Sequence, residues 1–257
     1  MNTLTLAPGR LLALGRSELT LLTRNRATLT MALLMPLVMV LVLKNSLAAY
    51  DLDGGAAAVG EATLTGGIGM VLVFVVYMNL VNAYVGRREE LVLKRLRTGE
   101  ANDLEILVGS ALPSAVLALV QITVLVGAGA AVLDVRAPRN PLLLVAAVLA
   151  GIVLLAALGA VTSAVTRTVE SAGLTTMPLF LVSALGSGMF VPVDEMPGVM
   201  ASVCELLPLS GVMTLVRAGW QGTAAGQDLA GAALVTLAWA MISMFAVQRW
   251  FRWEPRR

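Results

Sequence analysis

The stretch from residue 141 to 166, PLLLVAAVLAGIVLLAALGAVTSAVT, decides the fold of this chain. It contains no charged side chain, and about 20 apolar residues suffice for a helix to cross a hydrocarbon layer of about 30 Å. The whole sequence has the same character, because 58% of its 257 residues are hydrophobic and 13% are charged, whereas soluble domains carry roughly 25% charged residues. The sequence therefore predicts an all-α protein whose solvent is the lipid bilayer.

Working outward from this stretch, six apolar runs predict six transmembrane helices, and only the first run contains a charge, Lys44. A seventh apolar run, residues 206–216, is too short to span, and we expect a re-entrant or interfacial segment there. We expect one transmembrane domain over residues 1–257. The predicted spans cover about 28–50, 64–85, 106–133, 141–166, 171–193 and 229–248.

The distribution of lysine and arginine predicts the orientation. With six spans both ends of the chain share one side, and 14 of the 18 Lys and Arg fall on that side. Short cytoplasmic loops are enriched in Lys and Arg, so we expect both termini in the cytoplasm. A signal peptide cleaved near residues 46–48 is the alternative for the start of the chain, but its basic leader would be unusually long.

A separate amphipathic element is predicted at residues 8–27. Helical spacing gathers most of its leucines on one side, and arginines such as Arg16, Arg24 and Arg26 cover the rest. Such a helix lies in the headgroup layer, where anionic membrane lipid attracts its cations. A longer first span is the alternative, but Arg24 and Arg26 would be costly deeper in the membrane.

The loop between the second and third predicted spans contains five basic and five acidic residues. Glu90 precedes Lys94 by four residues, a pair that supports a helix, and Gly99 is a typical helix terminator. Asn102 and Glu105 predict a capping box that begins the next helix. Basic residues alone would only fix topology, to which acidic residues contribute little. A partly apolar helix with charges of both signs suits docking onto a soluble protein.

The chain's composition also limits its chemistry. It has no histidine and one cysteine, which argues against zinc sites, haem sites and an internal disulfide. Its net charge of +2 gives no reason to expect nucleic acid. No GxxxxGK[ST] phosphate-binding loop exists, because neither Lys44 nor Lys94 follows one. We therefore predict no enzyme activity and no cofactor in this chain. The energy for its work would then come from a partner protein.

A broken segment is predicted before the last span, at residues 194–222. Pro192 and Pro197 break helix on either side of Asp194 and Glu195. Trp220 is placed like an interfacial anchor. Broken backbone at membrane depth is tolerated only where protein buries it or where it lines a cavity. We expect this hairpin to close an external opening, either as a structural lid or in contact with substrate.

The order of these elements resembles the ABC-2 type permeases, the membrane subunits of bacterial ATP-binding-cassette exporters of drugs, antibiotics, lipids or polysaccharide. Three motifs carry the resemblance: the Arg-Arg-Glu-Glu to Leu-Lys-Arg-Leu-Arg-Thr loop at 87–98, the Met-Phe-Val-Pro-Val turn with Met-Pro at 189–197, and Leu-Pro-Leu-Ser at 207–210. The resemblance covers essentially the whole chain. Family members usually place proline soon after the loop threonine, whereas Gly99 and Glu100 follow it here.

The resemblance implies a dimer of permeases, identical or homologous, in the bacterial inner membrane. Two cytoplasmic ATPase subunits, which bind ATP and Mg²⁺, would complete the complex. Residues 8–27 would be the elbow helix, and residues 87–105 the coupling loop seated on the ATPase. Substrate would leave between the two permeases. The coupling residues so implied are Arg87, Arg88, Glu89, Glu90, Leu93, Lys94, Arg95, Leu96, Arg97, Thr98, Gly99 and Glu100. The extracellular gate is expected at Pro192, Asp194, Glu195, Pro197 and Pro208.

The polar residues within the spans are neutral, which favours a hydrophobic or amphipathic small molecule, such as a drug or antibiotic, over a charged substrate. Export of a lipid or glycan precursor is the alternative. An ion-coupled secondary transporter normally keeps ionisable residues at membrane depth, and a non-transporting scaffold is a further alternative. Hydrogen bonding between helices competes as the explanation of the polar residues. The pathway candidates are Tyr77, Asn79, Asn82, Gln121, Thr175, Thr176, Ser183, Ser187, Met189 and Phe190.

Overall fold

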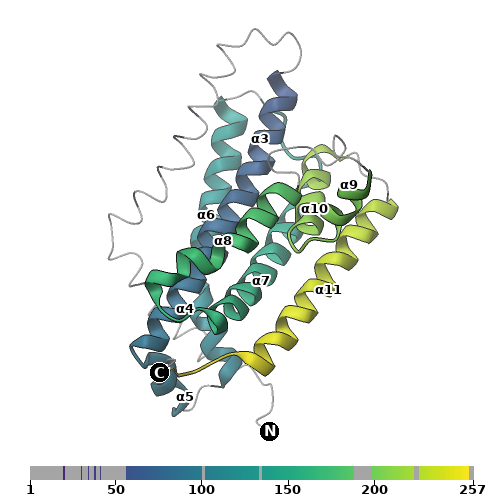
Figure 1. Ribbon diagram of the computed structural model, residues 1–257. Helices are drawn as coiled ribbons and strands as arrows, with labels where there is room; N and C mark the ends of the chain where they lie inside the picture. Colours follow the sequence, from purple (N-terminus) through teal and green to yellow (C-terminus); the bar gives the residue numbers. More distant parts are fainter. Residues whose placement is uncertain are drawn as a thin grey trace.

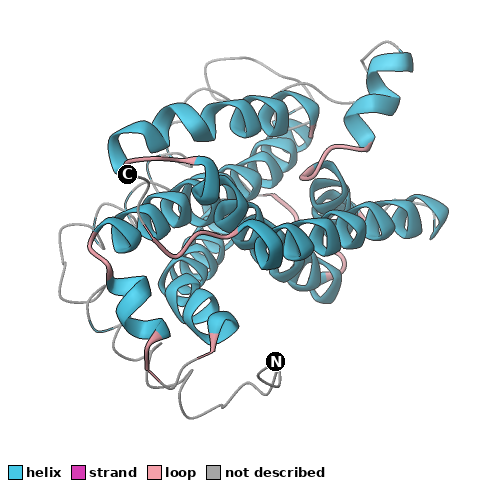
Figure 2. Cartoon of the chain, turned by 60° about the horizontal axis from the view of Figure 1, so that its bottom comes forward, coloured by secondary structure: helices cyan, strands magenta, loops and turns pink. Residues whose placement is uncertain are grey.

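The structure is a computed structural model, and the part of the chain that it describes is a bundle of helices without strands (Figure 2). The predicted interfacial helix and the first predicted span lie outside the described residues, apart from isolated helical positions, and so does the whole segment at 188–197. The structure describes residues 56–99, 102–132, 135–187, 198–222 and 226–254, with single helical positions at Thr20, Thr30, Leu34, Val38 and Leu41.

Five helical segments in the described part are long and apolar enough to cross a membrane. They lie at approximately the positions of the second to sixth predicted spans, which confirms these helices. The first of the five, residues 59–89, is a continuous helix built from three elements, the central one π-helical. The elements are α3 (Ala56–Val71), η1 (Leu72–Met78), α4 (Asn79–Glu89), α6 (Asp103–Val132), α7 (Pro141–Val165), α8 (Val169–Gly186) and α11 (Gly226–Trp250).

Three shorter helices lie at opposite ends of the bundle (Figure 1). The six-residue helix α5 (Val92–Arg97) follows α4 at one end, which we call the α5 end. Helices α9 (Gly198–Glu205) and α10 (Ser210–Gln221) lie at the other, which we call the α10 end. Residues 251–254 lie beside α4 and α5, so the last span returns the chain to the α5 end.

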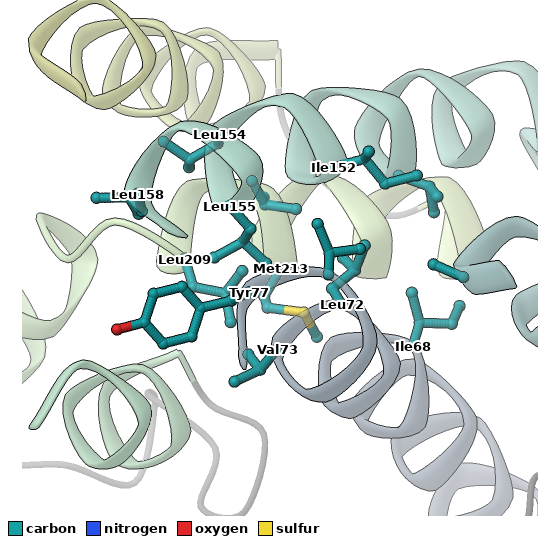
Figure 3. Packing of buried hydrophobic residues seen from close by; sticks show 14 of the residues in the cluster. Ile68, Leu72, Val73, Tyr77, Ile152, Leu154, Leu155, Leu158, Leu209 and Met213 are labelled. Carbon is teal, nitrogen blue, oxygen red and sulfur yellow. The ribbon is translucent and has the colours of Figure 1, made fainter. Parts of the chain in front are cut away.

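The core of the bundle forms where η1, α7 and α10 meet. Figure 3 shows Leu72 of η1, Leu155 of α7 and Met213 of α10 converging on one another, and each is at most 1% exposed. These positions come from segments far apart in the sequence. Their burial fixes α10 against η1 and α7 rather than leaving it on the outside of the bundle.

Helices α9 and α10 are related by a bend of 93°. Together they form either one broken span, which would be the sixth in the described part, or a re-entrant loop. The apolar run predicted at 206–216 therefore does become a separate short helix, although it extends to Gln221. The expectation that Trp220 is an interfacial anchor is wrong, because its side chain is 1% exposed and lies in the core.

The ends of the helices follow local capping chemistry. The predicted capping box is confirmed at the start of α6: the Asn102 backbone N–H donates to Glu105 Oε2 at 3.0 Å, and the Glu105 N–H donates to Asn102 Oδ1 at 2.8 Å. At the start of α7, Asn140 Oδ1 accepts from the Leu143 N–H at 3.1 Å, with Pro141 in the first turn. Such caps satisfy backbone donors that a helix leaves unpaired.

Candidate functional site

The candidate site is the segment from residue 87 to 99 at the α5 end. Its sequence was expected to form a helix ended by Gly99, and α5 does end just before Gly99, but an additional break separates α5 from α4. Helix α4 continues through Glu89, and Leu91 then takes a left-handed conformation, with φ of 59°. A left-handed residue with a side chain costs roughly 1–2 kcal/mol. This turn redirects the chain, so that α5 sets off from α4 as a separate helix.

The break at Leu91 separates the predicted helical pair of Glu90 and Lys94. Glu90 caps the end of α4, whereas Lys94 lies inside α5, and its Nζ forms a salt bridge of 2.9 Å with Glu254 Oε1. The expected pair within one helix was therefore wrong. The partner of Lys94 is instead Glu254 of the C-terminal tail, 160 positions away. The spacing of residues in the sequence cannot predict a contact over such a distance.

Arg88 was expected to meet a partner, but its side chain is 2% exposed. Its Nη1 donates to the Ser163 carbonyl at 2.8 Å, and its Nη2 donates to the carbonyls of Thr166 and Arg167. These carbonyls lie at the end of α7, where a helix leaves its last acceptors unsatisfied. The expectation that Arg88 contacts the ATPase is therefore corrected. Its guanidinium group has several N–H donors, and it supplies them to the end of α7.

The α4 helix is also joined to α6 by polar contacts near the candidate site. Arg87 Nη1 donates to Ser110 Oγ at 2.6 Å, and the hydroxyl of the buried Tyr84 donates to the Leu107 carbonyl at 3.0 Å. With the Arg88 cap, these contacts tie the last turns of α4 to both α6 and α7. Arg87 and Arg88 therefore hold the bundle together at the α5 end.

Within α5 the apolar residues are buried or half-buried, whereas the charged residues are exposed. Leu93 is fully buried and anchors the helix to the bundle. Arg97 Nε forms a 3.1 Å salt bridge with Asp103 Oδ1, and its guanidinium carbon lies 5.0 Å from the centre of the Trp253 ring. Leu96 is half-buried.

The exposed positions of the segment other than Arg97 carry charges of both signs and include one apolar residue. Leu91 is 41% exposed, and its neighbours in the sequence include exposed acidic and basic residues. We call these positions the α5 face; Glu100 lies outside the described residues. The α5 face consists of Glu89, Glu90, Leu91, Lys94, Arg95, Thr98 and Gly99.

The candidate pathway residues do not form one surface. Tyr77 is buried, and its hydroxyl lies 3.1 Å from Thr162 Oγ1. Thr175 Oγ1 lies 2.9 Å from Thr166 Oγ1. Both are contacts between polar side chains of different segments. Such contacts were the alternative explanation of these polar residues, in place of a substrate pathway. Four further candidates are buried, and Met189 and Phe190 lie outside the described residues. The four buried candidates are Gln121, Thr176, Ser183 and Ser187.

Asn79 and Asn82 differ from the other candidates because both lie on an exposed side of α4. Asn79 Nδ2 donates to Ser114 Oγ of α6 at 3.1 Å. One turn earlier in the same long helix, the 46% exposed ring of Phe74 lies 5.2 Å from the ring of Phe180 in α8. The strip of Phe74, Asn79 and Asn82 therefore lies between α6 and α8. We call it the open strip.

Only one of the expected gate residues, Pro208, lies in the described part, where it is buried in the turn between α9 and α10. This turn is attached to its neighbours on both sides. Ser210 Oγ donates to the Gly186 carbonyl at 3.2 Å, and Trp239 Nε1 donates to the Leu206 carbonyl at 2.8 Å. The turn is therefore fixed to α8 and α11. Pro192, Asp194, Glu195 and Pro197 lie outside the described residues.

Comparison with known proteins gives one family for most of this chain. The chain matches the model of the ABC-2 type transporter family over residues 10–220, which is most of its length. No curated protein sequence matches the chain significantly. The α5 segment and α9 fall within the matched range, and so does α10 except for its last residue, Gln221. The chain therefore belongs to the ABC-2 type transporter family, as a transmembrane permease of an ABC transporter, and this membership implies partnership with an ATP-binding subunit.

Proposed function

We propose that the chain is the permease of an exporter and that the α5 face receives the ATPase. One observation carries this proposal: a short helix is anchored by the buried Leu93 and leaves a face of mixed charge exposed at one end of the bundle. Charges of both signs set the orientation of a protein contact, and an exposed apolar residue such as Leu91 adds buried area.

The attachment of α5 supports a role in transmitting force. The α4 helix runs without interruption into η1 and α3, and Arg88 joins its last turn to the end of α7. Displacement of α5 by a partner would therefore move the ends of two long helices together. Coupling of this kind requires packed elements that move as units.

The substrate that we propose is a hydrophobic or amphipathic small molecule, such as a drug or antibiotic. The open strip supports this choice, because it combines an aromatic ring with two neutral amides and no charge. Met177 of α8, which is 44% exposed, adds an adaptable apolar surface near Phe180. Export of a lipid or glycan precursor is the second candidate, because the same apolar strip would accommodate an acyl chain.

The assembly that we propose has two permease chains, identical or homologous, and two ATPase subunits that bind ATP and Mg²⁺. This chain would hydrolyse no ATP itself. The excess of Lys and Arg on the side of the α5 end supports a cytoplasmic location for both termini, in the inner membrane of a bacterium. The α9–α10 pair would then lie at the outer end, where it closes the exit.

The sharpest test reverses the acidic charge of the α5 face in the double variant E89K/E90K. Both side chains are exposed, so the permease should fold normally while its electrostatic fit to the ATPase is lost. We expect the affinity for the ATPase to fall by about 100-fold, since losses of 2–5 kcal/mol are typical when charges at a contact are unpaired. Pull-down of the ATPase with the purified permease, and substrate efflux from cells, measure the effect.

Glu205→Lys provides the matched control, because Glu205 is an exposed acidic residue of α9 at the α10 end. This variant should bind the ATPase like the wild type. Unchanged binding and transport in E89K/E90K would contradict the assignment of the α5 face. Equal losses in the double variant and the control would show a general effect of charge instead.

A further inference from the structure

The C-terminal tail, residues 251–254, follows α11 back to the α5 end and lies against α4 and α5 (Figure 1). The Phe251 N–H still donates to the Val247 carbonyl at 3.0 Å, and the chain then leaves the helix. The sequence of this segment contains none of the motifs described above. Its residues nevertheless make the contacts of the α5 segment that span the most sequence. The function proposed above gives these contacts no role.

Two aromatic contacts fix the tail to the bundle. The Phe251 ring lies 5.9 Å from the Tyr84 ring at an interplanar angle of 82°, and 4.9 Å from the Trp253 ring at 72°. Both are edge-to-face arrangements, which aromatic pairs favour. Tyr84 is itself held in place by its hydrogen bond to the Leu107 carbonyl. The tail is therefore seated on a rigid part of α4.

The other side of the tail contacts α5 through two cations. The Trp253 ring receives the guanidinium group of Arg97 at 5.0 Å, and Glu254 forms the salt bridge with Lys94. Cation–π contacts and exposed ion pairs are weak individually. Here they act on neighbouring turns of one short helix, so that they constrain both its position and its rotation.

Helix α5 needs such support because it cannot maintain its own structure. It has six residues, whereas isolated helices shorter than about 12–15 residues are marginal in water. It also begins after the left-handed Leu91, which adds local strain. Leu93 provides one anchor to the bundle. The other contacts of α5 with the bundle are the half-buried Leu96 and the exposed ion pair of Arg97 with Asp103, and exposed ion pairs are weak, so the tail contacts add to the restraint on the rotation of the helix.

We propose that residues 251–254 act as a strap that holds α5 in the orientation required for its partner, with Trp253 as the positioning residue. The strap also connects α5 to α11, so that the last span follows the movement of the α5 segment. This role rests on the proposed function of the α5 face as far as the ATPase is concerned. The positioning of α5 itself can be tested on the permease alone.

The first experiment measures amide hydrogen exchange of the purified permease in lipid nanodiscs, for wild type and W253A. We expect the α5 amides to exchange about tenfold faster in W253A, the factor produced by losing contacts of about 1.4 kcal/mol. Amides of α7 should be unaffected. W253F keeps a ring for Arg97 and should restore most of the protection.

Trp250→Ala is the matched control, because Trp250 lies at the end of α11, is 61% exposed and precedes the tail. Its loss should leave α5 exchange within about twofold of wild type. Unchanged α5 exchange in W253A would overturn the strap. Equal effects of W250A and W253A on α5 would also overturn it, because both would then act through α11.

The second experiment compares transport with ATP hydrolysis in the reconstituted complex. We expect W253A to reduce the amount of substrate moved per ATP by about fivefold while the complex still assembles, because a loosely held α5 transmits less movement. A normal ratio together with fast α5 exchange would overturn the link between the strap and transport. If wild-type permease binds no ATPase, the proposed function fails, but the exchange experiment still decides whether the strap exists.

Discussion

At each end of the bundle an arginine side chain donates to carbonyls at the end of a helix, but the two arginines differ in how deeply they are buried. At the α5 end, Arg88 donates to carbonyls at the end of α7 and is 2% exposed. At the α10 end, Arg217 Nη1 donates to the Ser187 carbonyl at 2.9 Å, at the end of α8, and Arg217 is half-buried. In both places a charge that sequence reading assigns to a loop completes a helix end of the same chain. A charged residue beside a span is therefore not by itself a sign of a partner.

The ends differ in what surrounds each arginine. At the α10 end the backbones approach closely: a Cβ atom on Gly219 would lie 2.8 Å from the Leu144 nitrogen, and one on Gly211 would lie 2.5 Å from the Ala232 carbonyl oxygen. At the α5 end, side chains make the contacts, several of them exposed. Backbone contacts leave no room for adjustment, whereas side-chain contacts can change partners. The comparison predicts a rigid α10 end and an adjustable α5 end.

Replacing Arg88 should have the largest effect. Arg88→Met removes the donors while keeping a long apolar side chain, so buried carbonyls at the end of α7 lose their partners. Each unsatisfied buried group costs about 1–3 kcal/mol, and we expect the free energy of unfolding to fall by about 3 kcal/mol in total. Unfolding of the purified permease in mixed micelles, followed by circular dichroism, measures this loss.

Two further variants sharpen the Arg88 prediction. Arg88→Lys keeps the charge but loses the planar fork of donors, so about half of the stability should remain lost. Arg95→Met removes an exposed arginine of the same segment and should cost less than about 0.5 kcal/mol. Similar losses for Arg88→Met and Arg95→Met would refute the helix cap.

Substitution of Gly219 should come next in size. The new methyl group of Gly219→Ala meets the backbone of Leu144, which cannot move as a side chain would. Overpacking of this kind costs about 1–3 kcal/mol, and we expect about 2 kcal/mol in the same unfolding assay. Gly231→Ala is the matched control, because nothing lies within 4 Å of a Cβ there. The control should be neutral or slightly stabilising, since alanine favours helix; destabilisation of both variants alike would argue against the close approach.

Arg217 should have the smallest effect of the three. Arg217→Met removes the donor to one buried carbonyl, that of Ser187, whereas Arg88→Met removes the donors to several, so we expect a loss of about 1 kcal/mol. Measured beside Arg88→Met under identical conditions, this variant tests the comparison directly. Equal losses would mean that burial does not distinguish the two caps.

Much of the fold was predictable because it depends on local patterns. The spans follow from apolar length, and the α6 capping box follows from Asn102 and Glu105. The exposure of the pathway candidates was less predictable, since Asn79 and Asn82 are exposed whereas Tyr77 is buried, and their role in a pathway stays a prediction. The spacing of polar residues does not reveal which side of a helix neighbours will cover, particularly after the π-helical turn of η1 shifts the register.

The sequence by itself determined that this chain consists of membrane-length helices with a charged segment between two of them. It also determined the family, because the family is recognised by the order of motifs along the sequence. Only the tertiary structure decided which charges of that segment face outward. Arg88 turned inward because α7 ends beside it, and Lys94 paired with Glu254 because α11 returns the tail to the α5 end. Both outcomes depend on contacts between distant segments, and the hydrogen-bonding needs of a helix end are visible only when its neighbours are in place.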